Sequence, residues 1–246
     1  MPYTSRIAFM LIVVAGFAHA AVIPYTEDFN DNTADDFSPL AEYSVNSQAY
    51  DINAGGSTSA GVLLPSTVQI TNAAGGPFTI AGTFSTAQLS KGKLGFAALG
   101  NDSGLSSSYY VAYLVGDAVV AQTDRLGLEL AEIGGDGQIN ASYTPATPYD
   151  LTGESFTVAL KANYDEGGVL SLQMRVRGDG FDQTLNATDT TPLTGEYFGY
   201  AAIKSGGPLD ATVDDFIMEV PEPGTIAVLL LGVTLGARHL RRRRND

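Results

Sequence analysis

Residues 155–177 read SFTVALKANYDEGGVLSLQMRVR. Apolar and polar side chains alternate along 156–161 and again along 170–177, so each run places its apolar residues on one face of a strand. Between the two runs, Gly167-Gly168 supplies residues that adopt positive φ at little steric cost, as a tight hairpin turn requires. The stretch therefore predicts an antiparallel hairpin with one face against a core and the other face in water.

Similar short β-prone runs fill the chain on both sides of this hairpin, separated by Gly, Asn, Asp, Ser and Pro. These runs are Thr67–Thr71, Phe78–Phe84, Leu94–Leu99, Tyr109–Val115, Arg125–Ile133, Tyr197–Ile203 and Val213–Val220. Together with the hairpin they give nine or more strands with almost no helical periodicity, which is typical of a β-sandwich. Because no repeat or long linker divides residues 21–220, we predict that they form one domain, called the body below.

The body is strongly acidic and lacks cysteine. It contains 7 Lys and Arg against 25 Asp and Glu, a net charge of −18. Such a surface repels phosphate backbones, so we expect no nucleic acid partner. The absence of cysteine excludes disulfides, thiolate metal sites and a cysteine nucleophile.

The N-terminus has the three parts of a secretory signal peptide. Arg6 precedes an apolar run over residues 7–18, and Ala18-His19-Ala20 follows as a small-x-small cleavage site. We therefore predict a signal peptide at residues 1–20 and a mature chain that starts at Ala21.

The C-terminus predicts a membrane anchor. Pro221 and Pro223 cannot continue a strand ladder and so end the body. The apolar segment 225–237 predicts a membrane helix, and the basic residues that follow it are expected to stay on the cytoplasmic side. These basic residues are Arg238, Arg241, Arg242, Arg243 and Arg244. A 13-residue helix is about 20 Å long against a hydrocarbon layer of about 30 Å, so the segment is short for a permanent anchor.

The order of Pro221-Glu222-Pro223, a short apolar helix and a terminal arginine cluster resembles the PEP-CTERM sorting domain of Gram-negative bacteria. The resemblance covers residues 221–246. It implies recognition of Pro221, Glu222 and Pro223 by an exosortase, transient anchoring in the inner membrane, and a final place in the cell envelope or outside the cell. The family is associated with exopolysaccharide and biofilm production. The alternative is an ordinary membrane protein whose C-terminal anchor is never removed.

Two acidic motifs bracket the body. Glu27-Asp28-Phe29-Asn30 lies near its start, and Val213-Asp214-Asp215-Phe216 lies near its end. The bracket resembles concanavalin A-like or laminin G-like domains, in which the first and last strands are neighbours. We therefore predict an all-β, jelly-roll antiparallel sandwich, flanked by the signal peptide and one transmembrane helix. If these strands pair, Asp28, Asp31, Asp214 and Asp215 come together as hard oxygen ligands that suit a structural Ca²⁺; otherwise they are turn residues of an acidic protein.

Paired catalytic carboxylates are not evident in the sequence. Glu129 and Glu132 share one predicted strand, but residues three apart on a strand face opposite sides. Both histidines, His19 and His239, lie in the predicted targeting segments, which leaves no Ser-His-Asp triad in the body. The acidic stretch Gly134–Gln138 has too few ligands for a calcium loop and predicts a tight turn. The sequence therefore predicts that the protein is not an enzyme.

Tyrosines are the candidate sugar-binding residues, because an aromatic ring can stack on a pyranose face and the chain has no tryptophan. Tyr109, Tyr110 and Tyr113 are close in sequence, although alternate members of such a group are also expected as half-buried sheet residues. We predict an exported, non-catalytic envelope or matrix protein that binds exopolysaccharide. The alternative is a polysaccharide hydrolase of concanavalin A-like fold.

Overall fold

The computed structural model describes residues 25–34, 36–38, 42–54, 62–71, 76–89, 92–117, 125–137, 139–204 and 208–220. The signal peptide predicted at residues 1–20 and the sorting tail predicted at residues 221–246 lie outside these ranges. Within these ranges every regular element is a β-strand, and no helix there is long and apolar enough to cross a membrane.

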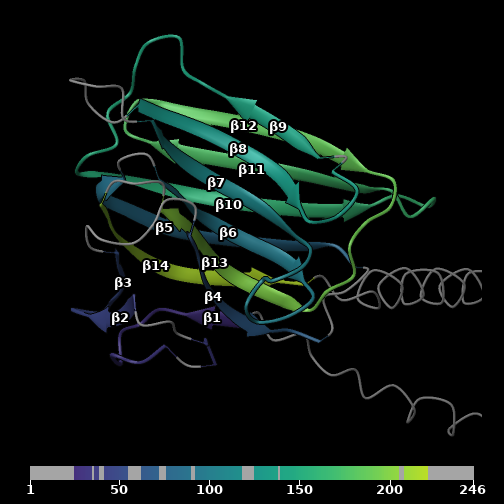
Figure 1. Ribbon diagram of the computed structural model, residues 1–246, viewed down its shortest axis with the longest axis horizontal. Helices are drawn as coiled ribbons and strands as arrows, with labels where there is room; N and C mark the ends of the chain where they lie inside the picture. Colours follow the sequence, from purple (N-terminus) through teal and green to yellow (C-terminus); the bar gives the residue numbers. More distant parts are fainter. Residues whose placement is uncertain are drawn as a thin grey trace, which may run out of the picture. The chain divides into compact units, whose positions relative to one another are not determined.

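The strands form two antiparallel sheets (Figure 1). Sheet A contains β1 (Tyr25–Glu27), β2 (Tyr43–Asn46), β3 (Ala49–Ala54), β5 (Phe78–Leu89), β10 (Glu154–Tyr164), β11 (Leu170–Gly178), β12 (Phe181–Asp189) and β14 (Leu209–Glu219). Its order is β12-β11-β10-β5-β14-β3-β2, with β1 also paired to β14. Sheet B contains β4 (Val62–Gln69), β6 (Lys93–Gly100), β7 (Tyr109–Asp117), β8 (Arg125–Ile133), β9 (Asn140–Tyr143) and β13 (Tyr197–Lys204), in the order β4-β13-β6-β7-β8-β9. The predicted β-sandwich is confirmed.

The predicted hairpin is strands β10 and β11. Val158 lies opposite Val176 in their antiparallel register. In the turn, the Asp165 carboxylate accepts hydrogen bonds from the amides of Gly167 and Val169, each at 2.8 Å, and Gly168 has a φ of +80°. The glycine is therefore at a position where other residues would be strained.

The first and last strands of the body pair as predicted. Strand β1 is antiparallel to β14, with Glu27 opposite Phe216. Strand β14 also pairs with β5 and β3, so it lies inside sheet A (yellow-green in Figure 1). The last strand of the body is thus hydrogen-bonded to a neighbouring strand along both of its edges.

Aromatic side chains from both sheets fill the space between them. Phe84 of β5 contacts Phe96 of β6 edge to face, with ring centroids 5.0 Å apart. Tyr200 of β13 and Phe216 of β14 pack in the same way at 5.4 Å. A buried hydrogen bond of 2.7 Å between the hydroxyls of Tyr50 on β3 and Ser66 on β4 adds a polar link between the sheets. The core is therefore continuous across the sandwich.

Candidate functional site

Strand β7 divides its tyrosines between two environments. Because successive side chains of a strand point to opposite faces, Tyr110 belongs to the core between the sheets, while Tyr109 and Tyr113 lie on the outer face of sheet B. All three side chains are buried. The tyrosines singled out from the sequence therefore do not form one surface.

The Tyr110 side chain contacts an acidic cluster that consists of the buried residues Glu132 and Asp189 and the exposed residue Asp136. Their carboxylate oxygens lie within 4.8 Å of one another. Asp189, at the end of β12, is fully buried. It accepts hydrogen bonds from the Tyr110 hydroxyl at 2.5 Å and from the Thr191 amide at 2.7 Å. The cluster thus joins the end of sheet A to the ends of β7 and β8 in sheet B.

The local backbone fits closely around these carboxylates. Glu132 accepts a hydrogen bond from the Asp136 amide at 3.1 Å. A Cβ atom at Gly135 would lie 1.5 Å from a Glu132 carboxylate oxygen, so any larger residue there would require the Glu132 side chain to move. Burial, reinforced by the nearby Asp136, raises the pKa of Glu132. Burial, followed by the hydrogen bond to Asp189, raises the pKa of Tyr110, which therefore stays a neutral donor.

Three carboxylates in one cluster are hard oxygen donors of the kind that hold Ca²⁺. The residues present therefore suit a metal ion, although not at the place predicted from the sequence. The chain bends at Gly134–Gly135 and has positive φ at Gly134 and Gly137, and Asp136 is the one carboxylate that this stretch supplies; the fold brings Glu132 and Asp189 to it. Motif spacing could not predict this cluster, because Asp189 lies 53 positions after Asp136 in the chain.

The predicted calcium ligands Asp28, Asp31, Asp214 and Asp215 do not converge in the same way. Burial, with smaller contributions from Asp215 and Asp28, raises the pKa of Asp214, so the strand pairing does bring these charges near one another. However, within the part of the chain that the structure describes, no three of these four carboxylates lie within 4.8 Å of one another. The side chains of Asp28 and Asp31 instead cap local turns. Asp28 accepts from the Asn30 amide at 3.1 Å, and Asp31 accepts from the Thr33 amide at 2.9 Å.

The outer face of sheet B carries a second apolar cluster, separate from the core. It consists of Ala97, Leu105, Tyr109, Val111, Tyr113, Ala131 and Ala201. One row of residues crosses this face from strand to strand, in the order Ala201, Gly95, Tyr113, Glu129 and Ser142. We call this row the Tyr113 row.

An ion pair lies beside the Tyr113 row. The Lys93 ammonium is 2.5 Å from the Glu129 carboxylate and 5.8 Å from the centroid of the Tyr113 ring. Burial, followed by the nearby Tyr109 and Glu129 side chains, raises the pKa of the Tyr113 hydroxyl. Glu129 and Glu132 face opposite sides of sheet B, as predicted, and belong to different sites.

The loop after β6, at residues 102–106, packs against Tyr109 on the outer face of sheet B. Asp102 accepts hydrogen bonds from the Gly104 amide at 2.9 Å and the Ser106 hydroxyl at 2.7 Å, and the Ser106 hydroxyl and amide hold the pKa of Asp102 below its usual value. The capped loop packs Leu105 into the apolar cluster with Tyr109. This end of the face is therefore fixed by hydrogen bonds of the loop itself.

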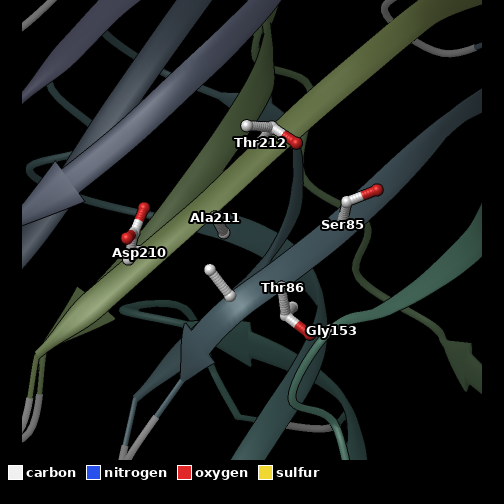
Figure 2. A pocket seen from close by; sticks show the side chains of 7 residues that line it. Ser85, Thr86, Gly153, Asp210, Ala211 and Thr212 are labelled. Atoms are coloured by element: carbon white, nitrogen blue, oxygen red, sulfur yellow. The ribbon is translucent and has the colours of Figure 1, made fainter.

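The outer face of sheet A has a small hollow between β5 and β14 (Figure 2). Its volume is about 220 Å³, and it lies where the pairing of these strands shifts register at Asp210 and Ala211. Ser85 and Thr212 lie on its rim, and the Ser85 hydroxyl donates to Ser155 at 3.1 Å. The hollow is smaller than the roughly 300–1,000 Å³ usual for ligand pockets.

The fold is similar to solved structures at low sequence identity. The GH43B protein of the Bacteroides ovatus xyloglucan PUL gives a TM-score of 0.54 at 12% identity, over 81% of this chain and 40% of that one. Lectin UEA-II complexed with galactose gives 0.53 at 11% identity, over 80% and 97%. Alginate lyase Aly36B with an alginate trisaccharide gives 0.51 at 10% identity, over 81% and 98%. The body therefore has a lectin-type, concanavalin A-like β-sandwich fold.

No protein-family model matches the sequence, and no curated protein is significantly similar to it. The resemblance of residues 221–246 to a PEP-CTERM tail thus stays a prediction. The chain spans only 40% of the GH43B protein, so the likeness concerns one part of that larger protein.

The prediction that the protein is not an enzyme is contradicted by these likenesses. Alginate lyase Aly36B and two GH43 proteins share the fold, the second being BlXynB from Bacillus licheniformis with a TM-score of 0.50 at 12% identity. The prediction depended on carboxylates that are close in sequence. This fold also assembles polar groups from distant strands, as the acidic cluster shows, so short motifs are not a sufficient test.

Proposed function

We propose that the protein binds carbohydrate on the outer face of sheet B. The observation that carries the proposal is the partly exposed ion pair of Lys93 and Glu129, which lies beside Tyr113 on this face. The shared fold supports it by analogy, since lectin UEA-II is described with galactose and Aly36B with an alginate trisaccharide. Exopolysaccharide is the natural ligand that we propose.

The Tyr113 row has the chemistry that sugars require. Ala201, Gly95 and Tyr113 are buried, so the accessible side chains of this face are those of Lys93, Glu129 and Ser142. The Lys93 ammonium donates hydrogen bonds and the Glu129 carboxylate accepts them, so together they match the hydroxyls of a sugar.

Blocking this face tests the proposal. The chain has no cysteine, so S142C introduces a single thiol at an exposed position directly opposite Glu129. We expect a bulky polyethylene glycol maleimide on S142C to weaken binding to host exopolysaccharide at least about tenfold, measured by affinity electrophoresis of the full chain before and after labelling.

The matched control is T157C, which carries the same label on an exposed position of β10 in sheet A. We expect the labelled T157C to bind as the unlabelled protein does. Equal binding by labelled and unlabelled S142C would contradict the proposed face, and absence of binding before labelling would contradict carbohydrate binding itself.

We propose in addition that the acidic cluster holds a structural Ca²⁺. The support is the close approach of three carboxylates, one of them fully buried, at a junction between the two sheets. Calcium bound there is expected to stabilise the folded state, because an ion that binds only the folded chain raises its melting temperature.

Removal of the ion tests this second proposal. We expect EDTA to lower the melting temperature of the full chain by several degrees and Ca²⁺ to restore it. D136N, at an exposed cluster position, is expected to lose this response, whereas D179N, at an exposed position outside the cluster, keeps it. A calcium response that survives D136N but disappears in D214N would place the ion between the first and last strands instead.

We also propose that the protein is exported and sorted by an exosortase, because residues 1–20 and 221–246 carry the required signals in the required order. The chain recovered from culture medium is expected to begin at Ala21 and to end near Pro221, as measured by intact mass. A membrane-bound species that retains Arg241–Arg244 as the final form would favour a permanent anchor.

A further inference from the structure

We infer that the outer face of sheet A binds a second copy of the chain, in a symmetric dimer whose two-fold axis runs along strand β5. This face lies on the side of the sandwich opposite to sheet B, so the dimer is independent of the proposed carbohydrate binding. The inference comes from the two sides of β5, which differ in a complementary way.

Three rows of outward-facing residues cross the middle of sheet A, each with one residue from β10, one from β5 and one from β14 (Figure 1). The rows are Lys161-Thr79-Glu219, Ala159-Ala81-Ile217 and Thr157-Thr83-Asp214. All nine side chains are half-buried or exposed. The middle strand β5 contributes only small side chains to these rows, which allows a second sheet to approach closely.

The first row has a cation on one side of β5 and an anion on the other. Lys161 and Glu219 both lie opposite Thr79, and both are exposed. Their backbones are two strand spacings apart, about 10 Å. Within the described part of the chain, neither side chain belongs to an ion pair. A two-fold rotation about β5 brings Lys161 of one copy over Glu219 of the other and the reverse, so the dimer gains two ion pairs.

The second row gives the same kind of match with apolar side chains. Ile217 is the one large hydrophobic residue that is exposed among the described residues, with 38% of its surface accessible. At the same level on the other side of β5 lies Ala159, whose side chain projects little from the sheet. The same rotation places Ile217 of each copy over Ala159 of the other. Both isoleucines are thereby removed from water, which favours association.

The third row matches a carboxylate with donors. Asp214 lies on one side of Thr83 and Thr157 on the other, with Arg177 next to Thr157. Arg177 is 3.6 Å from the carboxylate of Asp182, and 56% of its side chain is exposed. In the dimer, Asp214 of one copy faces the Thr157 hydroxyl and the Arg177 guanidinium of the other, both of which donate hydrogen bonds. All three rows are therefore self-complementary about one axis, as a symmetric dimer requires.

The area of this face suits a weak dimer. Strands β5, β10, β11 and β14 are each at least 9 residues long, so their joint face measures about 19 Å by about 30 Å. Two such faces in contact bury about 1,100 Å² in total, which is near the lower limit for specific complexes. We expect a dissociation constant of about 10 µM. Carbohydrate binding measured well below that concentration concerns the monomer, so T157C remains a valid control for sheet B.

Cross-linking tests the position of the axis. A residue of β5 lies on the axis and meets its own counterpart in the other copy. The chain has no cysteine, and T83C introduces one on β5. We expect a short bismaleimide to join two T83C chains at about 50 µM, about five times the expected dissociation constant, measured as a doubled mass on a denaturing gel. The full chain is used in mild detergent, because a membrane helix is predicted at its C-terminus.

The matched control for T83C is S171C, which carries its thiol at an exposed position of β11 on the same face. In this dimer Ser171 lies about 19 Å across the sheets from its counterpart, beyond the reach of the reagent. We expect little linked product from S171C. Equal linking in the two variants, or no linking in T83C, would overturn the axis along β5.

The contact between Lys161 and Glu219 is tested by exchanging their charges. We expect K161E and E219K each to weaken association about tenfold, because each brings like charges together twice in the dimer. The combination K161E/E219K is expected to restore it, measured by sedimentation equilibrium of the full chain in density-matched detergent. A general effect of net charge predicts otherwise for E219K, since that change makes the acidic chain less negative and would strengthen association.

Three results of this series would overturn the dimer. The first is an unaltered chain that stays monomeric about tenfold above the expected dissociation constant. The second is association that neither single substitution weakens, which would place the contact elsewhere on the chain. The third is a double variant that associates no better than the single ones, because Lys161 and Glu219 would then not face each other.

Discussion

The pleat of strand β7 is the constraint on which both proposed sites depend. It directs Tyr110 inward, where its hydroxyl donates to the buried Asp189 across the two sheets. It directs Tyr113 outward, beside Lys93 and Glu129. A shift of one residue in the register of β7 would exchange the two side chains and dismantle both sites together. Core packing therefore fixes this register, and the two sites follow from it.

Alternating apolar residues made much of the fold predictable. The bounds Arg125–Ile133 of β8 agree with the sequence prediction, and the hairpin of β10 and β11 was expected from its alternation and turn. Strand β12 was missed because its sequence, FDQTLNATD, shows little alternation of apolar and polar residues. It is a strand because β11 offers a complete antiparallel partner and because Leu185 and Asp189 face inward. Tertiary pairing thus overrides local preference there.

The sites were less predictable than the strands, because each one combines residues that are distant in sequence. The choice of Tyr109, Tyr110 and Tyr113 identified the right strand, although alternation separates Tyr110 from the other two. Lys93 gave no sequence signal, since its partner Glu129 is 36 residues away. For the same reason Asp189 was not associated with Glu132. Topology, rather than motif spacing, brings these groups together, and the outer face of sheet B and the acidic cluster are the result.

A structure of the protein bound to an oligosaccharide tests the central claim most directly. The account predicts sugar density on the outer face of sheet B, with Lys93 and Glu129 turned toward the ligand. Sugar bound in the hollow between Ser85 and Thr212 on sheet A, or against the loop of Asp136, would contradict it.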